Sequence, residues 1–315
     1  MKIQSIGGEF ELIKRITKKS RVKNVVVGIG DDCAIIQVNG KYLAITTDSV
    51  IEDVHFSLKW FSPIQIGKKA IEINVSDIAS KGGVPRYALI SLILKKDTDV
   101  EFVDKLYEGI YETTKKYSID VIGGNTAHGN QIVIDVCMIG EVRKNNLCLR
   151  SSAKPNDAVF VTDELGKSTI GLKLLEKNIL HYETLKKAYL EPKSQLEKSG
   201  LLSRYANAMI DISDGLASET LHIAEKSKCG VILYKEKIPI TNETKSACKL
   251  VGKSAYDSAL YGGEDYELLF TVPRENLKKI KGAYYIGNVT KQNGVYLVSN
   301  GKKKEIKRKG YDHFG

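Results

Sequence analysis

The sequence has 315 residues, of which 42% are hydrophobic and 27% are charged, and its formal net charge is +10. This composition excludes a collagen, a coiled coil and a disordered protein, and the length allows two folded domains. The five cysteines include no Cys-x-x-Cys pair, which fits neither a disulfide framework nor a zinc site and predicts a cytoplasmic protein. Apolar runs are far shorter than the roughly 18 residues of a membrane span, and the N-terminal residues lack a signal-peptide core, so we expect neither membrane association nor export.

Half of the positive excess lies in the segment GKKKEIKRKG, residues 301–310, which has six basic residues and one acidic residue. Such a cluster can bind nucleic acid by releasing counterions from the phosphate backbone. However, no aromatic residue is interleaved with these charges to stack on bases, and lysines commonly protect the exposed edge of a sheet. We therefore expect a solvated edge strand here and no nucleic-acid partner.

The first half of the chain alternates between β-branched runs and helical periodicity. Asn39-Gly40 predicts a tight hairpin between the second and third strands. In the first helix, a polar face with Asn74, Asp77 and Lys81 opposes an apolar face, and Gly82-Gly83 predicts its end. Strands are expected at 25–27, 34–38, 41–46, 87–94, 120–122 and 132–142, and helices at 63–81 and 101–116.

The polar connection SSAKPND after Arg150 predicts a domain boundary. We therefore expect an N-terminal α/β domain over residues 1–150 and a C-terminal α/β domain over residues 151–315. In the second half, strands are expected at 158–162, 208–212, 231–234, 266–272 and 295–298, and helices at 168–177 and 216–227.

Carboxylates recur beside Gly, Ser or Thr at predicted strand ends and on one helix: Asp31, Asp32, Asp48, Asp77, Asp211 and Asp214. If they converge on one cleft they repel one another unless a cation lies between them, and Mg²⁺ binds through carboxylates, water and phosphates. Thr46, Thr47 and Ser213 supply neighbouring hydroxyls. Predicted glycine-rich turns at 123–125 and 262–265 allow the backbone to approach an anionic ligand. The set indicates a Mg-nucleotide site without a P-loop, although each Asp taken alone could simply cap a helix or stabilise a turn.

A series of longer motifs runs in order along the chain: GGEFELI, GIGDDCAII, TTDSVIEDVHF, INVSDIASKGGVPRYALISL, IGGNTAHG, RSSAKPND, DISDGLASE, GGEDYELLFT and KGYDHF. Together they resemble the thiamine-monophosphate kinase family of the AIR-synthase-like superfamily. The resemblance implies phosphorylation of thiamine monophosphate to thiamine diphosphate, with ATP as co-substrate and several Mg²⁺ ions. It also implies a two-domain α+β fold and a homodimer in which the N-terminal sheets form a barrel.

The resemblance also implies roles for individual residues. The implied magnesium ligands are Asp32, Thr46, Thr47, Asp48, Asp77, Asn125, Asp211 and Asp214, where Asn125 replaces an Asp that is common in the family. The implied nucleotide contacts are Tyr107, Gly124, Asn125, Arg150 and Ser213. The implied substrate contacts are His55, Glu264 and Tyr311.

The acceptor in this reaction is a phosphate oxygen that is already anionic, so no general base is needed. Two anions must instead be brought together, and we expect direct in-line transfer in which Asp48, Asp77 and Arg150 serve catalysis. We expect Asp48 to be a ligand that bridges two metal ions, and Asp77 to be a second bridging ligand.

Alternatives remain at several positions. Without the motif, His55 could simply pack in the interior, and Tyr107 could form an aromatic stripe with Tyr111. For the whole chain, one alternative is another ATP-dependent AIR-synthase-like enzyme with a different acceptor. A second alternative is a non-catalytic protein that binds Mg-nucleotide or anionic surfaces.

Overall fold

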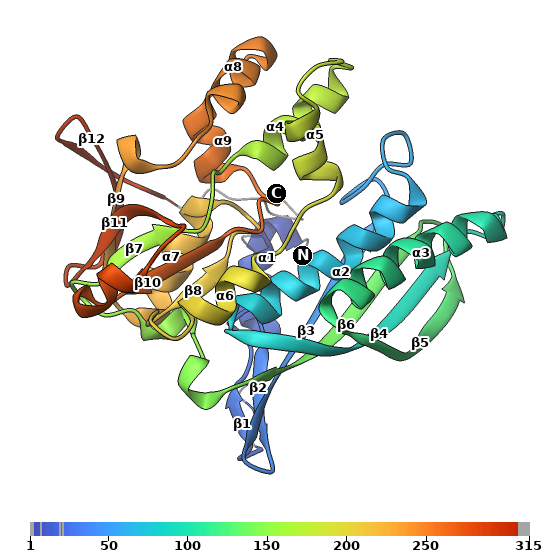
Figure 1. The fold of residues 1–315 in the computed structure, drawn as a ribbon, viewed down its shortest axis with the longest axis horizontal. Coiled ribbons are helices and arrows are strands. Elements are labelled where there is room, and N and C mark those ends of the chain that lie inside the picture. Colours follow the sequence, from blue (N-terminus) through green and yellow to red (C-terminus); the bar gives the residue numbers. More distant parts are fainter. Residues whose placement is uncertain (1–2, 7, 19, 21, 308–315) are drawn as a thin grey trace.

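The computed structural model describes residues 3–6, 8–18, 20 and 22–307. The chain forms two mixed β-sheets, one from each half, with helices packed on and between them (Figure 1). The described residues contain no helix that is long and apolar enough to cross a membrane.

The N-terminal sheet has the strand order β1-β2-β3-β6-β4-β5, and only the β4–β5 pair is parallel. Asn39 and Gly40 have φ angles of 48° and 80°, so the predicted hairpin is confirmed, with both turn residues in the left-handed region. Within the described residues the six strands form an open sheet and not a closed barrel. The strands are β1 (Val25–Val27), β2 (Ala34–Val38), β3 (Lys41–Ile51), β4 (Gly83–Leu94), β5 (Asp120–His128) and β6 (Val133–Val142).

Two long helices, α2 (Pro63–Ser80) and α3 (Val100–Tyr117), cover one face of this sheet (Figure 1). A capping box starts α2, because the Ser62 hydroxyl accepts a hydrogen bond from the Gln65 N–H while the Gln65 side chain accepts one from the Ser62 N–H. The two helices pack closely at glycine: a Cβ atom on Gly109 would lie 2.0 Å from the Ile64 carbonyl oxygen. The short elements η1 (Ile3–Ile6) and α1 (Gly8–Ile16) precede the sheet.

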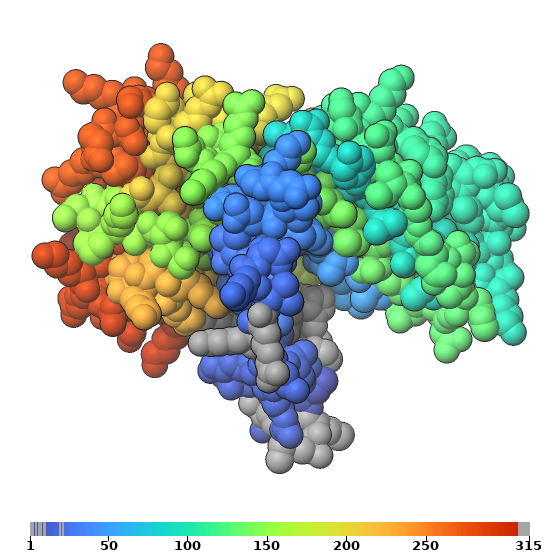
Figure 2. All heavy atoms as spheres, turned by 90° about the horizontal axis from the view of Figure 1, so that it is seen from below, coloured from blue at the N-terminus to red at the C-terminus, as the bar shows by residue number. Residues whose placement is uncertain are grey.

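The opposite face of the N-terminal sheet carries exposed apolar side chains. Val84, Tyr87 and Leu89 of β4 are 44%, 45% and 38% exposed, and Ile122 of β5 is 56% exposed. Figure 2 shows this side of the molecule, where residues of β4, β5 and β6, coloured teal to green, form the surface on the right. No element of the described chain packs over these side chains.

The C-terminal sheet has the order β13-β12-β9-β11-β7-β10-β8. Its edge strand β13 contains the basic residues Lys302–Lys304, which confirms the predicted edge strand. The strands are β7 (Ala158–Val161), β8 (Met209–Asp211), β9 (Gly230–Tyr234), β10 (Leu268–Val272), β11 (Tyr284–Thr290), β12 (Gly294–Ser299) and β13 (Lys302–Glu305). The helices are α4 (Lys167–Glu176), α5 (Glu183–Leu190), α6 (Leu196–Leu202), α7 (Leu216–Ser227), α8 (Asn242–Val251) and α9 (Ala255–Tyr261), with 3₁₀ turns η2 (Lys144–Asn146), η3 (Arg150–Ser152), η4 (Lys235–Lys237) and η5 (Arg274–Lys279).

Several sequence predictions need correction. The strand expected to end at residue 46 continues to Ile51, so Asp48 lies inside β3 and not at its end. The turn expected at 123–125 is wrong, because these residues continue β5 and pair with β4. There, a Cβ atom on Gly124 would lie 1.9 Å from the Ile90 carbonyl oxygen, so glycine permits a close approach of strands. Helices α5, α6, α8 and α9 and strand β11 were not predicted from the sequence.

Candidate functional site

A cavity of about 670 Å³ lies where the two halves of the chain meet. One side is formed by α2, β3 and the loop before β2, and the other by the loops before α7 and β10 and the start of α4. The cavity is lined by Asp31, Asp32, Thr46, Thr47, Asp48, Ser49, Val54, His55, Ile73, Asp77, Arg150, Ser168, Thr169, Leu172, Tyr189, Asp211, Ser213, Asp214, Tyr261, Gly262, Gly263, Glu264 and Tyr266.

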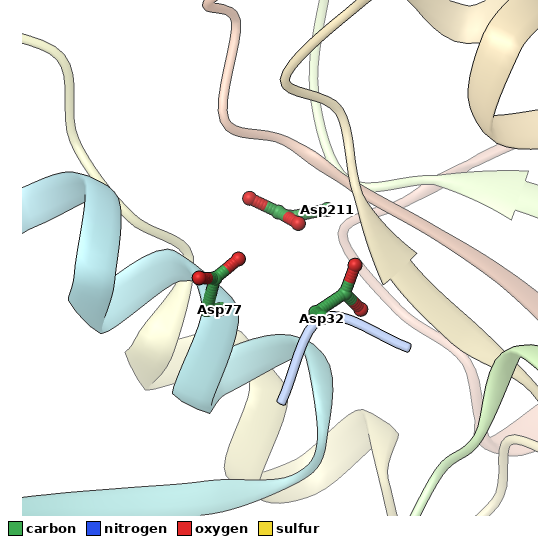
Figure 3. Close-up of side chains that lie close together, drawn as sticks. All are labelled: Asp32, Asp77 and Asp211. Carbon is green, nitrogen blue, oxygen red and sulfur yellow. The ribbon is translucent and has the colours of Figure 1, made fainter. Parts of the chain in front are cut away.

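Three carboxylates from distant parts of the sequence meet at one end of this cavity. Asp32 comes from the loop before β2, Asp77 from α2 and Asp211 from the end of β8, and their side chains point toward one another (Figure 3). One oxygen from each lies within 4.8 Å of the others, a spacing that could hold a metal ion. Desolvation and the neighbouring Asp32 raise the pKa of Asp211 to about 7, and desolvation and Asp48 raise the pKa of Asp77 well above its usual value.

Asp32 has a different electrostatic environment from its two neighbours. The buried ammonium of Lys81, at the end of α2, lies 2.7 Å from its Oδ2 atom, and the guanidinium of Arg150 binds its Oδ1 atom. Ser80 donates a further hydrogen bond to Oδ2 at 2.7 Å. Desolvation favours the neutral acid, but Arg150 and Lys81 outweigh it and hold the pKa of Asp32 well below its usual value. Asp32 is therefore ionised, and in this structure Arg150 directs its charge to that carboxylate.

Further acidic groups extend the cluster along the cavity. Desolvation and the nearby Asp214 raise the pKa of Asp48 to about 7. The backbone N–H of Asp214 donates to Glu219 at 3.0 Å, and Glu219 is 2% exposed. Desolvation and Asp214 raise the pKa of Glu219 well above its usual value. Without a cation, several of these carboxyl groups retain protons near neutral pH.

Side chains alternate between the two faces of the sheet along β3, so the neighbouring Thr46 and Thr47 point to opposite faces. Thr46 is buried and donates to the Asp77 carboxylate at 2.5 Å, so its hydroxyl belongs to the acidic cluster. Thr47 points to the other face, where its hydroxyl donates to Asp135 of β6 at 3.4 Å. Ser49 also donates to Asp135, at 2.7 Å. Both Thr47 and Ser49 still border the cavity.

The cavity lining also includes His55 and Glu264, and the Glu264 N–H donates to the carbonyl oxygen of Ser213 at 2.7 Å. The backbone N–H of Ile51 donates to Nδ1 of His55 at 3.1 Å, so the neutral imidazole carries its proton on Nε2. Glu264, whose φ angle is 65°, lies in the loop before β10 and forms an ion pair with Lys69 at 2.6 Å. The apolar and aromatic lining here includes Val54, Ile73, Leu172, Tyr189, Tyr261 and Tyr266.

The structure brings together most, but not all, of the residues expected in the site. Tyr107, on α3, and Gly124 and Asn125, on β5, do not border the cavity of their own chain. The Tyr107 ring instead lies 5.7 Å from the Tyr111 ring, centre to centre. Tyr311 lies outside the described residues.

Sequence reasoning missed the roles of Lys69, Lys81, Asp135 and Glu219. Lys69 and Lys81 are 1% and 0% exposed, and each pairs with a carboxylate at the cavity. A possible signal was their position in a helix that is otherwise rich in apolar residues, since a lysine there must find a buried counterion. Asp135 similarly interrupts the apolar strand VIDVCMI.

The chain is similar to known proteins in sequence and in fold. Two family models match the chain: AIR synthase related protein, N-terminal domain, over residues 30–142, and AIR synthase related protein, C-terminal domain, over residues 154–300. Thiamine-monophosphate kinase of Aquifex aeolicus (strain VF5) is 38% identical to this chain over 318 residues, and the match covers 100% of both chains. Thiamine-monophosphate kinase of Bacillus subtilis (strain 168) is 36% identical over 327 residues, and the match covers 97% of this chain and 99% of the relative. A solved structure described as AaThiL complexed with AMPPCP and TMP has a TM-score of 0.90 at 38% identity, covering 100% of this chain and 99% of that chain. The expected two-domain AIR-synthase-like α+β fold is thus confirmed.

The raised pKa values predict how pH and divalent cations affect stability. Asp48 and Asp211 have a pKa of about 7 in the folded chain, whereas an unfolded Asp has a pKa of about 3.9. Between about pH 3.9 and about pH 7 the folded chain holds protons that the unfolded chain has released. The free energy of unfolding that these bound protons contribute is therefore lost as the pH rises toward about 7. A divalent cation that replaces the protons should therefore raise the melting temperature more at about pH 8 than at about pH 6.

Thermal unfolding with EDTA or with MgCl₂ at both pH values measures this effect. Asp211→Asn removes one of the titrating groups and should reduce the difference between the two pH values. Equal stabilisation by the cation at both pH values in the wild type would contradict the proposed linkage.

Proposed function

We propose that this chain, which belongs to the thiamine-monophosphate kinases of the AIR synthase related family, transfers the γ-phosphoryl group of ATP to thiamine monophosphate in the cavity between its two halves. The products are thiamine diphosphate and ADP. The observation that carries the proposal is the convergence of Asp32, Asp77 and Asp211 on a cavity that is also lined by apolar and aromatic side chains. The acidic cluster suits cation-bound phosphates, and the apolar and aromatic lining suits an organic ring system.

The donor set fits Mg²⁺, because it consists of carboxylate and hydroxyl oxygens. The sulfur of Cys33 is beside this cluster in sequence, but desolvation and the charge of Asp77 raise the pKa of its thiol well above the usual value. Cys33 therefore offers no thiolate that would favour a softer metal. Asp32, Asp48, Asp77, Asp211 and Asp214 would hold Mg²⁺, with Thr46 and Thr47 beside them. When bound, Mg²⁺ neutralises phosphate oxygens and aligns them for transfer.

The chain's own residues orient the reactants in this proposal. The acceptor oxygen is anionic, so the transfer proceeds in line without a general base or a phosphorylated side chain. Ser213 and Arg150 border the acidic end and are proposed to contact the nucleotide, and Arg150 also keeps Asp32 ionised. Glu264 offers negative charge to the cationic thiazolium ring, and His55, which also borders the cavity, is the second proposed substrate contact.

We further propose that the active form is a homodimer joined through the open face of the N-terminal sheet. Apolar side chains that are as exposed as Tyr87 and Leu89 on one contiguous sheet face are unusual in a monomer. Two copies packed through this face would form the expected barrel and cover the exposed edges. Tyr107, Gly124 and Asn125 would then contact nucleotide in the cavity of the partner copy, since they do not border their own.

The first test measures both products of the proposed reaction. With ATP, Mg²⁺ and thiamine monophosphate, we expect ADP and thiamine diphosphate to form in equal amounts, as measured by chromatography of a single reaction. ADP release that does not depend on thiamine monophosphate would exclude this acceptor. The absence of ADP release would exclude a kinase.

Replacing Asp48 by Asn tests the acidic cluster. The substitution removes one negative charge at a site that must balance cations and phosphates, so we expect turnover to fall by on the order of a hundredfold. The melting temperature of the cation-free protein should stay the same or rise, because like-charge repulsion is relieved. Asp163→Asn is a matched control, because Asp163 does not border the cavity. Near-normal turnover in Asp48→Asn would contradict the role of this carboxylate.

Intersubunit complementation tests the shared site. Asp77→Asn and Tyr107→Ala, coexpressed with different tags, should each be nearly inactive as homodimers. In a mixed dimer, one site carries both substitutions and the other carries none, so a random mixture should regain about a quarter of wild-type turnover. A mixture no more active than its two components would place Tyr107 outside the partner's site.

A further inference from the structure

Lys69 is a buried charge that the proposed transfer step does not use. It lies on α2, and its side chain is 1% exposed. A lysine ammonium removed from water must be compensated by partners, because its desolvation costs several kcal/mol. Lys69 has two such partners: its Nζ atom lies 2.6 Å from Oε1 of Glu264 and donates to the backbone carbonyl oxygen of His55 at 2.8 Å.

Two aromatic rings complete the environment of this ammonium. Nζ lies 4.6 Å from the centre of the Tyr189 ring and 5.3 Å from the centre of the Phe61 ring. The rings pack edge to face at 5.3 Å and are 5% and 4% exposed. A cation at this distance from aromatic rings is attracted to them, most strongly where water is excluded. Lys69 is therefore held by elements of both halves of the chain.

The partners of Lys69 are the two residues proposed to contact the organic part of the substrate. His55 belongs to the turn after β3, and Glu264 belongs to the loop before β10, so they come from different halves. Glu264 also adopts a left-handed φ of 65°, which is unfavourable for a non-glycine residue and must be stabilised by its surroundings. The ion pair with Lys69 provides such an anchor.

Lys69 is one member of a row along α2. Lys69, Ile73, Asp77 and Lys81 follow at intervals of four residues, which places them along one ridge of the helix. Ile73 and Asp77 line the cavity, and each lysine binds a carboxylate at one end of it. Lys81 pairs with Asp31 and Asp32, whereas Lys69 pairs with Glu264, so the two lysines anchor different carboxylates.

We infer that Lys69 is a positioning residue for the organic part of the acceptor. It fixes the Glu264 carboxylate against the turn that carries His55, so the cationic thiazolium ring meets a carboxylate that is already in place. The inference rests on the proposed function, because that function assigns the thiamine moiety to the part of the cavity that contains Glu264.

The test compares Lys69→Met with the wild type in the coupled measurement of ADP and thiamine diphosphate. We expect KM for thiamine monophosphate to rise about tenfold, equivalent to about 1.4 kcal/mol, because Glu264 loses its anchor. The kcat value and KM for ATP should change less than about threefold, because Lys69 contacts no residue of the acidic cluster. An unchanged KM for thiamine monophosphate, or an equal rise in both KM values, would overturn the inference.

A double-mutant cycle with Glu264→Gln shows whether Lys69 acts through this carboxylate. We expect Lys69→Met combined with Glu264→Gln to raise KM for thiamine monophosphate no more than about twofold beyond Glu264→Gln alone. Multiplicative effects of the two substitutions would overturn the inference. The double variant also leaves no unpaired buried charge, so it provides this readout if Lys69→Met alone does not fold.

Lys186 provides a matched control on α5. It is 9% exposed, pairs with Glu183 at 2.6 Å and donates to the Leu180 carbonyl oxygen, but it does not border the cavity. Lys186→Met should leave both KM values unchanged. If Lys186→Met raises KM for thiamine monophosphate as much as Lys69→Met does, the effect of Lys69 is one of general stability and the inference is overturned. If the wild type forms no thiamine diphosphate, the proposed function and this inference both fail, whereas an active wild type with an unaffected Lys69→Met variant overturns the inference alone.

Discussion

The cavity depends on the buried ion pairs between Lys81 and the loop that carries Asp31 and Asp32. The Lys81 ammonium lies 2.5 Å from Asp31, 2.7 Å from Asp32 and 3.0 Å from the carbonyl oxygen of Met209. These three contacts join the end of α2 to the loop before β2 and to β8, so one charge connects both halves of the chain. Removing one partner of such a pair costs about 3–5 kcal/mol, because the remaining charge stays buried without compensation. The acidic loop can therefore enter the interior only while α2 presents this lysine.

Among the described residues, the contacts of Asp48, Asp77 and Asp211 include no counterion as close as those of Asp32, and this difference separates their pKa values from that of Asp32. Lys81 and Arg150 lower the pKa of Asp32, whereas desolvation and mutual repulsion raise those of Asp48, Asp77 and Asp211. A site of this kind gains stability from added positive charge, and Mg²⁺ bound to phosphates would supply that charge together with the substrate. The same property suits a reaction in which two anionic phosphates must approach each other. The protein thus stores unfavourable repulsion that its ligands relieve.

Helix α2 relates the acidic cluster to the ion pair of Glu264. Its ridge presents Asp77 to the carboxylate cluster and Ile73 to the cavity, while Lys69 holds Glu264 and the turn with His55. A rigid helix buried between two sheets sets the spacing of these groups more precisely than loops could. The open face on the other side of the N-terminal sheet has no such role within one chain. Its exposed apolar residues and the remote position of Tyr107 and Asn125 are both accounted for if two copies share each site.

The residue types and local patterns of the sequence were sufficient to predict the Asn39-Gly40 hairpin, helices α2 and α3 and an acidic site, whereas the two-domain α+β fold was implied by the family resemblance. The hairpin, the helices and the acidic site depend on neighbouring residues or on functional groups that are visible in the sequence itself. The tertiary structure alone decided the partners: Lys69 with Glu264, Lys81 with Asp32, and Ser76 with Asp211 at 2.7 Å. It also decided that residues 123–125 continue a strand, because pairing with β4 outweighs the local turn preference of glycine. Each of these outcomes joins segments far apart in sequence, and their burial and electrostatics exist only after the two halves have packed together.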